Sequence, residues 1–255
     1  MPIAAKNAWA SWWGALMFYT CLPIPQAYGV EFRWISQWVP WVGVVVGGLM
    51  ALVDWSLWVV HMPVLVRSTL VITFGIALTG GLHLDGVMDT ADGLAVPDAS
   101  KRLEVMADSH MGAFGGIAAV VLIALKVTAL AAISEHRLFV LIAVAVCGRW
   151  GQQWAIAAYP YLKKEGKGAF HKAALPSRVH ALPSLVIMAL LGEAVSALGW
   201  VPLDLVWRSL FVGVGLALIT SAYFNHKLGG HTGDTYGAVV EWSEALLLCF
   251  LSCSF

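Results

Sequence analysis

Eight long apolar runs, separated by short polar connections, dominate this chain and restrict what it can fold into. About 20 apolar residues can cross a bilayer as a helix, which satisfies its own backbone polar groups in lipid. We therefore predict an all-α, polytopic membrane helical bundle of about seven or eight transmembrane helices, in a single domain over residues 1–255. The first run is short and is either a span or a re-entrant segment. The predicted spans are Trp9–Leu22, Trp38–Val60, Val64–Leu82, Phe114–Ile133, Leu138–Ala158, Leu182–Leu198, Val206–Phe224 and Ala238–Cys253.

Composition agrees with a membrane protein and argues against several other classes. Hydrophobic residues make up 60% of the 255 residues and charged residues 12%, whereas soluble domains average about a quarter charged. Many of the 13 tryptophans lie near the ends of apolar runs, as in the aromatic belts of membrane proteins. The formal net charge is zero, so no nucleic acid is expected as a partner. The four cysteines contain no CxxC pair and indicate neither a zinc site nor a disulfide.

The distribution of cations predicts which side of the membrane carries the polar connections. With eight spans, four connections face one side of the membrane: 23–37, 83–113, 159–181 and 225–237. Cytoplasmic loops of membrane proteins carry an excess of Lys and Arg. We therefore expect these connections, and a polar active site between them, at the cytoplasmic side. They contain nine cations, Arg33, Lys101, Arg102, Lys163, Lys164, Lys167, Lys172, Arg178 and Lys227, against Lys6, Arg67, Arg137 and Arg208 on the other side.

An acidic stretch between Gly80 and Gly116 carries the strongest chemical signal. Asp85, Asp89 and Asp92 fall within about a 60° sector of a helix, and Glu104 and Asp108 repeat an i, i+4 spacing shortly afterwards. Carboxylates gathered on two helical faces repel one another unless a cation lies between them. Mg²⁺ prefers a few carboxylates together with waters and substrate phosphates. We favour a magnesium site here over the alternative of a solvated acidic loop.

Two basic features are candidates for binding phosphate. Lys163, Lys164 and Lys167 lie in a glycine-containing loop, where lysines offer point charges to phosphate. The alternative is plain topogenic charge, and this segment alone does not decide between them. Arg149 lies inside a predicted span, where an ionised group usually faces the bundle interior. It either clamps a phosphate or pairs with an acidic residue, and we favour the clamp. No role is assigned to Lys126 or Asp54, which also lie in spans.

A third polar connection surrounds three glycines near the C-terminus. It holds Asn225, Lys227, Thr232 and Asp234, and Asp234 either completes the metal site or acts as a general base. An ordinary Gly/Asp turn is the simpler explanation of this segment taken alone. Glu241 and Glu244 follow three residues apart on the last helix, which predicts that this face lines a polar cavity.

These motifs together resemble one known family, the cobalamin synthases, which are the adenosylcobinamide-GDP ribazoletransferases of bacterial vitamin B12 assembly. The matching strings are FYTCLPIP, HLDGVMDTADGL, LEVMADSHMGAFG and GGHTGDTYGA, with Arg149 ahead of Pro160 and with Glu241 and Glu244 downstream. The resemblance covers nearly the whole chain in the expected order. It implies a magnesium-dependent, multi-pass enzyme of the bacterial inner membrane. The implied reaction joins adenosylcobinamide-GDP to α-ribazole or its 5′-phosphate, releases GMP and gives adenosylcobalamin or its phosphate.

The resemblance and the residue pattern together imply roles for particular residues. Asp85, Asp89, Asp92 and Asp108 are expected to hold one or two Mg²⁺ ions against the diphosphate. The base is expected to be Glu104 or Asp234. The lipid bilayer is a further partner, and other cobalamin-assembly enzymes or a second copy of the chain stay open. The groups expected to hold substrate phosphates are Arg149, Lys163, Lys164, Lys167, Asn225, Lys227 and Thr232.

Two other enzyme classes and one transport class are the alternatives. CDP-alcohol phosphotransferases need an Ala-Arg pair soon after the first Asp-Gly, and Asp85-Gly86 lacks it. Prenyltransferases carry DxxxD motifs, which Asp85 to Asp89 and Glu104 to Asp108 resemble loosely. A cation-coupled transporter would place its acids inside spans, whereas most of these lie between spans. Whether ribazole or its phosphate is the acceptor stays open.

Overall fold

The fold is built from α-helices of very different lengths. This computed structural model describes residues 3–25, 28–163 and 169–253, and this part of the chain contains no β-strand, only an isolated bridge between Tyr161 and His231. The elements are α1 Ile3–Tyr19, η2 Ile35–Gln37, α2 Val39–Val59, α3 Val64–Leu78, α4 Leu82–Ala95, η3 Ala99–Lys101, α5 Arg102–Val105, α6 Ala113–Ala132, α7 Arg137–Ala158, α8 Ala169–Ala174, η4 Arg178–Ala181, α9 Leu182–Ala197, α10 Leu203–Leu228 and α11 Gly233–Ser252.

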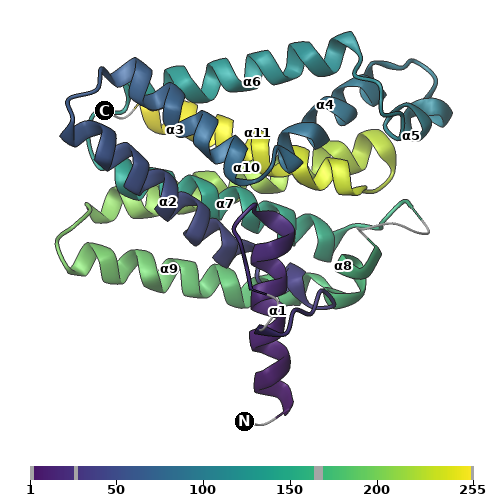
Figure 1. The fold of residues 1–255 in the computed structure, drawn as a ribbon. Coiled ribbons are helices and arrows are strands. Elements are labelled where there is room, and N and C mark those ends of the chain that lie inside the picture. The colour runs from purple at the N-terminus through teal and green to yellow at the C-terminus, as the bar shows by residue number, and fades with distance from the viewer. Residues whose placement is uncertain (1–2, 26–27, 164–168, 254–255) are drawn as a thin grey trace.

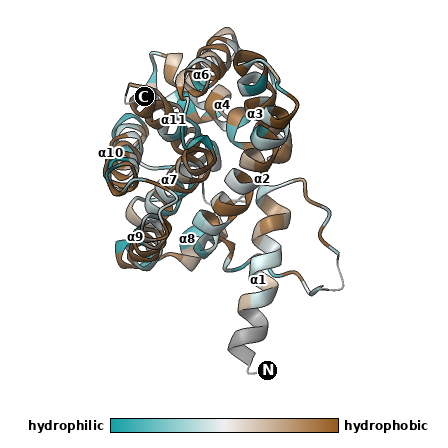
Figure 2. Ribbon diagram, turned by 90° about the vertical axis from the view of Figure 1, so that its left-hand side faces the viewer, coloured by the Kyte–Doolittle hydropathy of each residue, from teal (hydrophilic) through white to brown (hydrophobic). Residues whose placement is uncertain are grey.

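The architecture is a polytopic membrane helical bundle, as predicted. Each of the eight predicted spans coincides with a helix, α1, α2, α3, α6, α7, α9, α10 or α11. Among the described residues, however, five helices are long and apolar enough to cross a membrane: α2, α6, α7, η4 with α9, and α10. The number becomes six if α3 and α4 form one bent span. The 17-residue α1 and the carboxylate-bearing α11 are not among them. Figure 2 shows hydrophobic residues along most helices, including α3, α6 and α9.

The chain bends sharply between α3 and α4. The two helix axes differ by 88°, and the turn between them contains Gly80 and Gly81, with φ angles of +61° and +70°. Glycine has no Cβ and adopts this left-handed conformation without strain. The helix in the predicted span Val64–Leu82 therefore ends earlier than expected, at Leu78. The acidic motif lies on a separate helix, α4, whose axis is nearly perpendicular to that of α3.

α7 is the central helix of the bundle. Of its most apolar 18 residues 78% are buried, against 22–39% in the other four candidate spans, and α2 runs against it (Figure 1). Gly43 and Gly47 of α2 make this approach close, because a Cβ at either position would lie 2.6–2.7 Å from the α7 backbone. Small residues four apart are a common way for membrane helices to pack.

A buried ion cluster ties α2, α3 and α7 together. Asp54 pairs with Arg137 at 2.6 Å and with Arg67 at 3.3 Å, and Arg137 also reaches the Ser68 hydroxyl at 3.1 Å. All of these side chains are buried. Asp54, to which the sequence assigns no role, is thus a structural partner for Arg67 and Arg137, two cations that the sequence analysis places on the side opposite the polar connections.

Candidate active site

The acidic helix α4 packs tightly against the start of α11. A Cβ on Gly86 would lie 2.4 Å from the backbone oxygen of Asp234, and one on Gly237 would lie 3.0 Å from the backbone of His83. Glycine at both positions therefore lets two helices from distant parts of the sequence approach closely. This contact brings the HLDGVMDTADGL and GGHTGDTYGA motifs together at one end of the bundle, near α5 and α8 (Figure 1).

Several carboxylates and one ammonium group interact electrostatically across this contact. Asp85 is exposed and Asp89 is half-buried one turn later on the same helix. The negative charges of Asp85, Asp234 and Asp92 all act on the Asp89 carboxylate, and the Lys163 ammonium group opposes them. The helical register predicted for the three aspartates of α4 is confirmed, since α4 runs unbroken from Leu82 to Ala95.

Asp92 has a structural role in addition to any chemical one. Its two carboxylate oxygens each accept a backbone N–H at 2.8 Å, one from Gly112 and one from Gly115. Gly112 is the N-cap residue of α6 and Gly115 lies in its first turn, where backbone N–H groups lack partners within the helix. Asp92 therefore caps α6 from α4, which the sequence spacing did not indicate.

The second acidic face that the sequence predicted does not form. α5 is only four residues long, so Asp108 lies beyond its end and shares no helix with Glu104. Asp108 instead accepts hydrogen bonds from the backbone N–H of His110 at 3.0 Å and interacts with its ring at 2.6 Å. These bonds hold the pKa of Asp108 below its usual value. Such local bonds of aspartate compete with helix formation. Both carboxylates are exposed.

Asp234 is held in place at the start of α11. It pairs with Lys163 at 3.2 Å and accepts a hydrogen bond from the Thr232 hydroxyl at 3.1 Å. Thr232 is fully buried and forms a capping box with Thr235, so its hydroxyl serves the helix terminus. Lys164 and Lys167 lie outside the described residues.

The glycine-rich connection and the segment before the basic loop form one unit. The His231 N–H donates to the Pro160 carbonyl, and the Leu162 N–H donates to the His231 carbonyl, both at 2.9 Å. The buried His231 ring bonds to Ser221 O at 3.1 Å and contacts Thr235 Oγ1 at 3.0 Å. Burial lowers the pKa of His231 to about 4, which leaves the ring neutral at pH 7. The bridge fixes Lys163 beside Asp234.

The two remaining residues of this connection lie on the last turn of α10. Asn225 is half-buried and its carbonyl accepts the Gly229 N–H at 2.7 Å. Lys227 is exposed, its Nζ lies 5.8 Å from the centre of the Tyr223 ring, and its carbonyl accepts a hydrogen bond from Arg102 at 2.9 Å. Their predicted phosphate contacts stay predictions.

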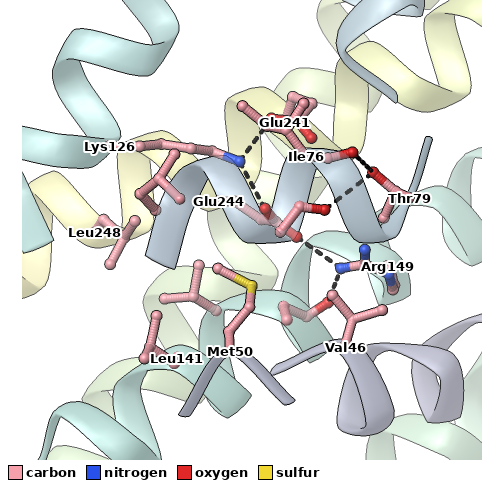
Figure 3. A pocket seen from close by; sticks show the side chains of 14 residues that line it. Val46, Met50, Ile76, Thr79, Lys126, Leu141, Arg149, Glu241, Glu244 and Leu248 are labelled. Carbon is pink, nitrogen blue, oxygen red and sulfur yellow. Dashed lines mark hydrogen bonds and ion pairs between the residues drawn. The ribbon is translucent and has the colours of Figure 1, made fainter. Parts of the chain in front are cut away.

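Arg149 takes part in a buried network of four charges deeper in the bundle (Figure 3). Its Nη1 lies 2.8 Å from Glu244 Oε1, while Lys126 Nζ lies 2.7 Å from Glu244 and 2.6 Å from Glu241. Two cations and two carboxylates therefore neutralise one another around a small cavity of about 30 Å³. Of the two alternatives for Arg149, the structure shows the pairing with an acid. Glu241 and Glu244 both line this cavity, together with apolar side chains such as Met50, Leu141 and Leu248.

A buried group of aromatic and imidazole side chains was not predicted from the sequence. Tyr19 of α1 contacts the His171 ring nitrogen of α8 at 3.4 Å, and its ring centre lies 6.4 Å from that of His83 on α4. All three are at most 3% exposed. His83 has no hydrogen-bond partner among the described residues, and its charge environment includes Arg149. The group joins the N-terminal helix to the acidic helix.

Comparison with known proteins decides the family of this chain. The sequence profile described as cobalamin-5-phosphate synthase matches residues 11–252. The chain belongs to the cobalamin-5-phosphate synthase family. Relatives named adenosylcobinamide-GDP ribazoletransferase come from Trichormus variabilis, with 52% identity over 93% of this chain and 94% of the relative, and from Thermosynechococcus vestitus, with 49% identity over 95% and 96%. A relative of the same name from Synechococcus elongatus is 46% identical over 95% and 96%. No solved structure matches the chain.

The acidic face of this cobalamin-5-phosphate synthase family member fits a magnesium ion only in part. Within the described ranges, no three His, Cys, Asp or Glu side chains are arranged as a ready-made metal site. Magnesium is, however, usually held by one or two protein carboxylates together with waters and substrate phosphates. Asp85 and Asp89, one turn apart and electrostatically coupled to Asp234, provide such a donor set. Asp92 already caps α6, and Asp108 has His110 as its partner.

Proposed function

We propose that this membrane transferase joins adenosylcobinamide-GDP to α-ribazole or its 5′-phosphate, releasing GMP and giving adenosylcobalamin or its 5′-phosphate. The observation that carries the proposal is the meeting of α4 and α11, which places Asp85 and Asp89 beside the Asp234–Lys163 pair. Carboxylates next to a lysine suit transfer between phosphate groups. The names of relatives that match almost the whole chain support the substrate.

We propose that the active site faces the cytoplasm from the bacterial inner membrane. The excess of cations in 23–37, 83–113, 159–181 and 225–237 supports this orientation. α4, α5 and α8 gather at one end of the bundle, the end to which these connections contribute (Figure 1). Both substrates would then reach the acidic face from the compartment in which nucleotides are made.

Magnesium is the proposed cofactor, with Asp85 and Asp89 as its protein ligands. When bound, it would neutralise charge that develops on the leaving phosphate. This assignment narrows the set expected from the sequence, because Asp92 accepts two backbone N–H groups and Asp108 is exposed on another segment. Asp92 would hold α6 in place, and Asp108 would order the 106–112 loop through His110.

The other residues of the site would bind substrate phosphate and accept a proton. Lys163 would exchange its Asp234 partner for a substrate phosphate, with Lys164 and Lys167 adding positive charge. Asp234, freed from Lys163 and still held by Thr232, would then accept the proton of the attacking ribose hydroxyl. As this proton leaves, the hydroxyl oxygen would form a bond to phosphorus and the bond between phosphorus and GMP would break. Asp234 is better placed for this than Glu104, which is exposed on α5. Arg149 would act by holding α11 through Glu244, without touching phosphate.

The test is Asp89→Asn in purified protein, assayed with adenosylcobinamide-GDP, α-ribazole phosphate and Mg²⁺. GMP release and the mass of the corrinoid product are measured, and EDTA should abolish both. Loss of a metal ligand removes several kcal/mol from transition-state stabilisation, so we expect a fall of roughly a hundredfold or more. Parallel assays with α-ribazole identify the preferred acceptor.

The matched control is Asp98→Asn. Asp98 lies exposed in the same connection and caps η3 through Ser100, and asparagine is an equally good cap. This variant loses the same charge and should keep wild-type activity. Full activity of Asp89→Asn would refute the metal assignment. An equal loss of activity in both variants would show that the loss of one negative charge, and not of a metal ligand, lowers the activity.

A further inference from the structure

An apolar groove runs along the back of the acidic helix. It has a volume of about 370 Å³ and lies between α4, α6, α10 and α11. None of its lining residues carries a charge. On α4 the lining residues occupy a different face from Asp85 and Asp89. The lining consists of Val87, Thr90, Ala91, Leu94, Ala118, Ile219, Thr220, Tyr223, Phe224, Trp242 and Leu246.

The groove opens to the outside of the bundle. Ile219 is 64% exposed and Tyr223 49% exposed, both on α10. α6 and α10 are two of the five helices able to cross a membrane, so the opening between them faces the hydrocarbon of the bilayer. Ile117 and Val120 of α6, also exposed, continue the apolar surface beside it. Acyl chains are the apolar molecules that this opening meets.

Two cations lie at the polar end of the groove. Lys227 follows the groove residue Tyr223 by one helical turn, with its Nζ 5.8 Å from the ring centre. Arg102 donates a hydrogen bond to the Lys227 carbonyl at 2.9 Å. From Ile219 to Lys227 the helix rises about 12 Å. This is the order of groups that a phospholipid presents, an apolar chain followed by a charged phosphate.

We propose that this groove binds one acyl chain of an anionic phospholipid, whose headgroup phosphate contacts Lys227 and Arg102. The chain would pack against Ala91 and Leu94 of α4 and against Trp242 of α11. A bound lipid therefore supports from behind the same two helices that carry the acidic face. The binding itself does not depend on the proposed reaction.

The first test uses the whole protein, stripped of lipid in detergent and titrated with phosphatidylglycerol under native mass spectrometry. Ala118→Phe fills the groove from α6 and should weaken the tightest bound lipid at least about tenfold. Ala124→Phe is the matched control, because Ala124 lies exposed on the same helix outside the groove. It should bind as the wild type does. Equal binding by both variants would overturn the proposal.

The second test uses only the wild-type protein, so it does not depend on whether a groove variant folds. Wild-type protein in vesicles containing phosphatidylglycerol with a photoreactive acyl chain should crosslink mainly within 87–94 and 219–224. Crosslinks spread evenly over α2, α6 and α9 would show only general solvation by lipid and refute a specific site.

The two cations at the polar end of the groove predict a preference for anionic lipid headgroups. Phosphatidylglycerol should bind at least about fivefold more tightly than phosphatidylcholine, since each of the two cations, Lys227 and Arg102, contributes about this factor near an anionic headgroup. Lys227→Gln should lower the preference about fivefold, the contribution of one cation, while Lys101→Gln, which removes an exposed cation of the neighbouring segment, should preserve it. A preference unchanged by Lys227→Gln would remove the headgroup from the proposal. If the nucleotide substrate prevented crosslinking of the groove, the groove would be a substrate site, and this result would contradict the lipid proposal.

Discussion

Glu244→Gln is the most informative single substitution in the buried charge network. Glu244 contacts Arg149 at 2.8 Å and Lys126 at 2.7 Å, and the side chains of these three residues are 12%, 3% and 7% exposed. Glutamine preserves the shape and removes the charge, which leaves two buried cations with Glu241 as their remaining acid in the network. Removing one partner of a buried ion pair costs about 3–5 kcal/mol. We expect about 3 kcal/mol here, because the amide oxygen still accepts one hydrogen bond.

Glu241→Gln is the matched control and should cost less. Glu241 contacts Lys126 at 2.6 Å, and Lys126 keeps Glu244 in that variant. The loss is one charged hydrogen bond, worth about 2 kcal/mol. The double variant Arg149→Met with Glu244→Gln removes a whole pair and leaves Lys126 with Glu241. It should therefore be more stable than Glu244→Gln alone by about 1 kcal/mol or more.

The assay is reversible unfolding of the protein in bicelles, followed by helical circular dichroism. It gives the free energy of unfolding of the wild type, of both single variants and of the double variant. A Glu244→Gln protein within about 0.5 kcal/mol of the wild type would show that the network contributes little and that Arg149 is free for another partner. Glu241→Gln costing more than Glu244→Gln would contradict the order derived from the contacts.

Three further predictions concern the site and its supports. Asp92→Ala leaves the N–H groups of Gly112 and Gly115 uncapped, so hydrogen exchange in the first turn of α6 should increase and stability should fall by about 1–2 kcal/mol. Gly86→Ala places a Cβ 2.4 Å from the Asp234 backbone and should cost about 1–3 kcal/mol together with activity, whereas Gly116→Ala, whose Cβ meets nothing within 4 Å, should be neutral or stabilising. The pKa of His231, about 4 against 6.5 in the unfolded chain, means that the unfolded state binds its proton first on acidification. Stability from this group should fall by about 2 kcal/mol between pH 7 and pH 5, and His231→Gln should flatten that part of the pH profile in thermal unfolding.

Local patterns were enough to predict the helices and the register of the acidic residues. The apolar runs gave the positions of eight helices, and the i, i+4, i+7 spacing placed Asp85, Asp89 and Asp92 on one helix. The predicted helical position of Asp108 is wrong, because a helix of four residues ends before it and a local bond to His110 replaces helical bonding. Spacing alone carries no information on whether a helix continues through a polar loop.

Pairings between distant residues could not be predicted from the sequence. Lys126 precedes Glu241 by 115 residues and Glu244 by 118, and their contact depends on how α6 and α11 pack. The sequence indicated an inward face for the two glutamates and an interior position for Arg149, but it did not say which charges meet. Asp92 is similar, since its partners Gly112 and Gly115 are 20 and 23 residues away.

The charges buried between α6, α7 and α11 also bear on how the protein is made. α11 is not among the helices that are apolar enough to enter a bilayer by length and composition, and a charged residue at a helix centre raises the cost of insertion by about 2.5–3.5 kcal/mol. Lys126 and Arg149, which neutralise its two glutamates, lie on helices that leave the ribosome earlier. Burial of the two glutamates of α11 is therefore favourable only where these two cations are present to pair with them. A chain truncated before α11 would leave both buried cations without these partners, which makes the unfinished bundle less stable than the finished one.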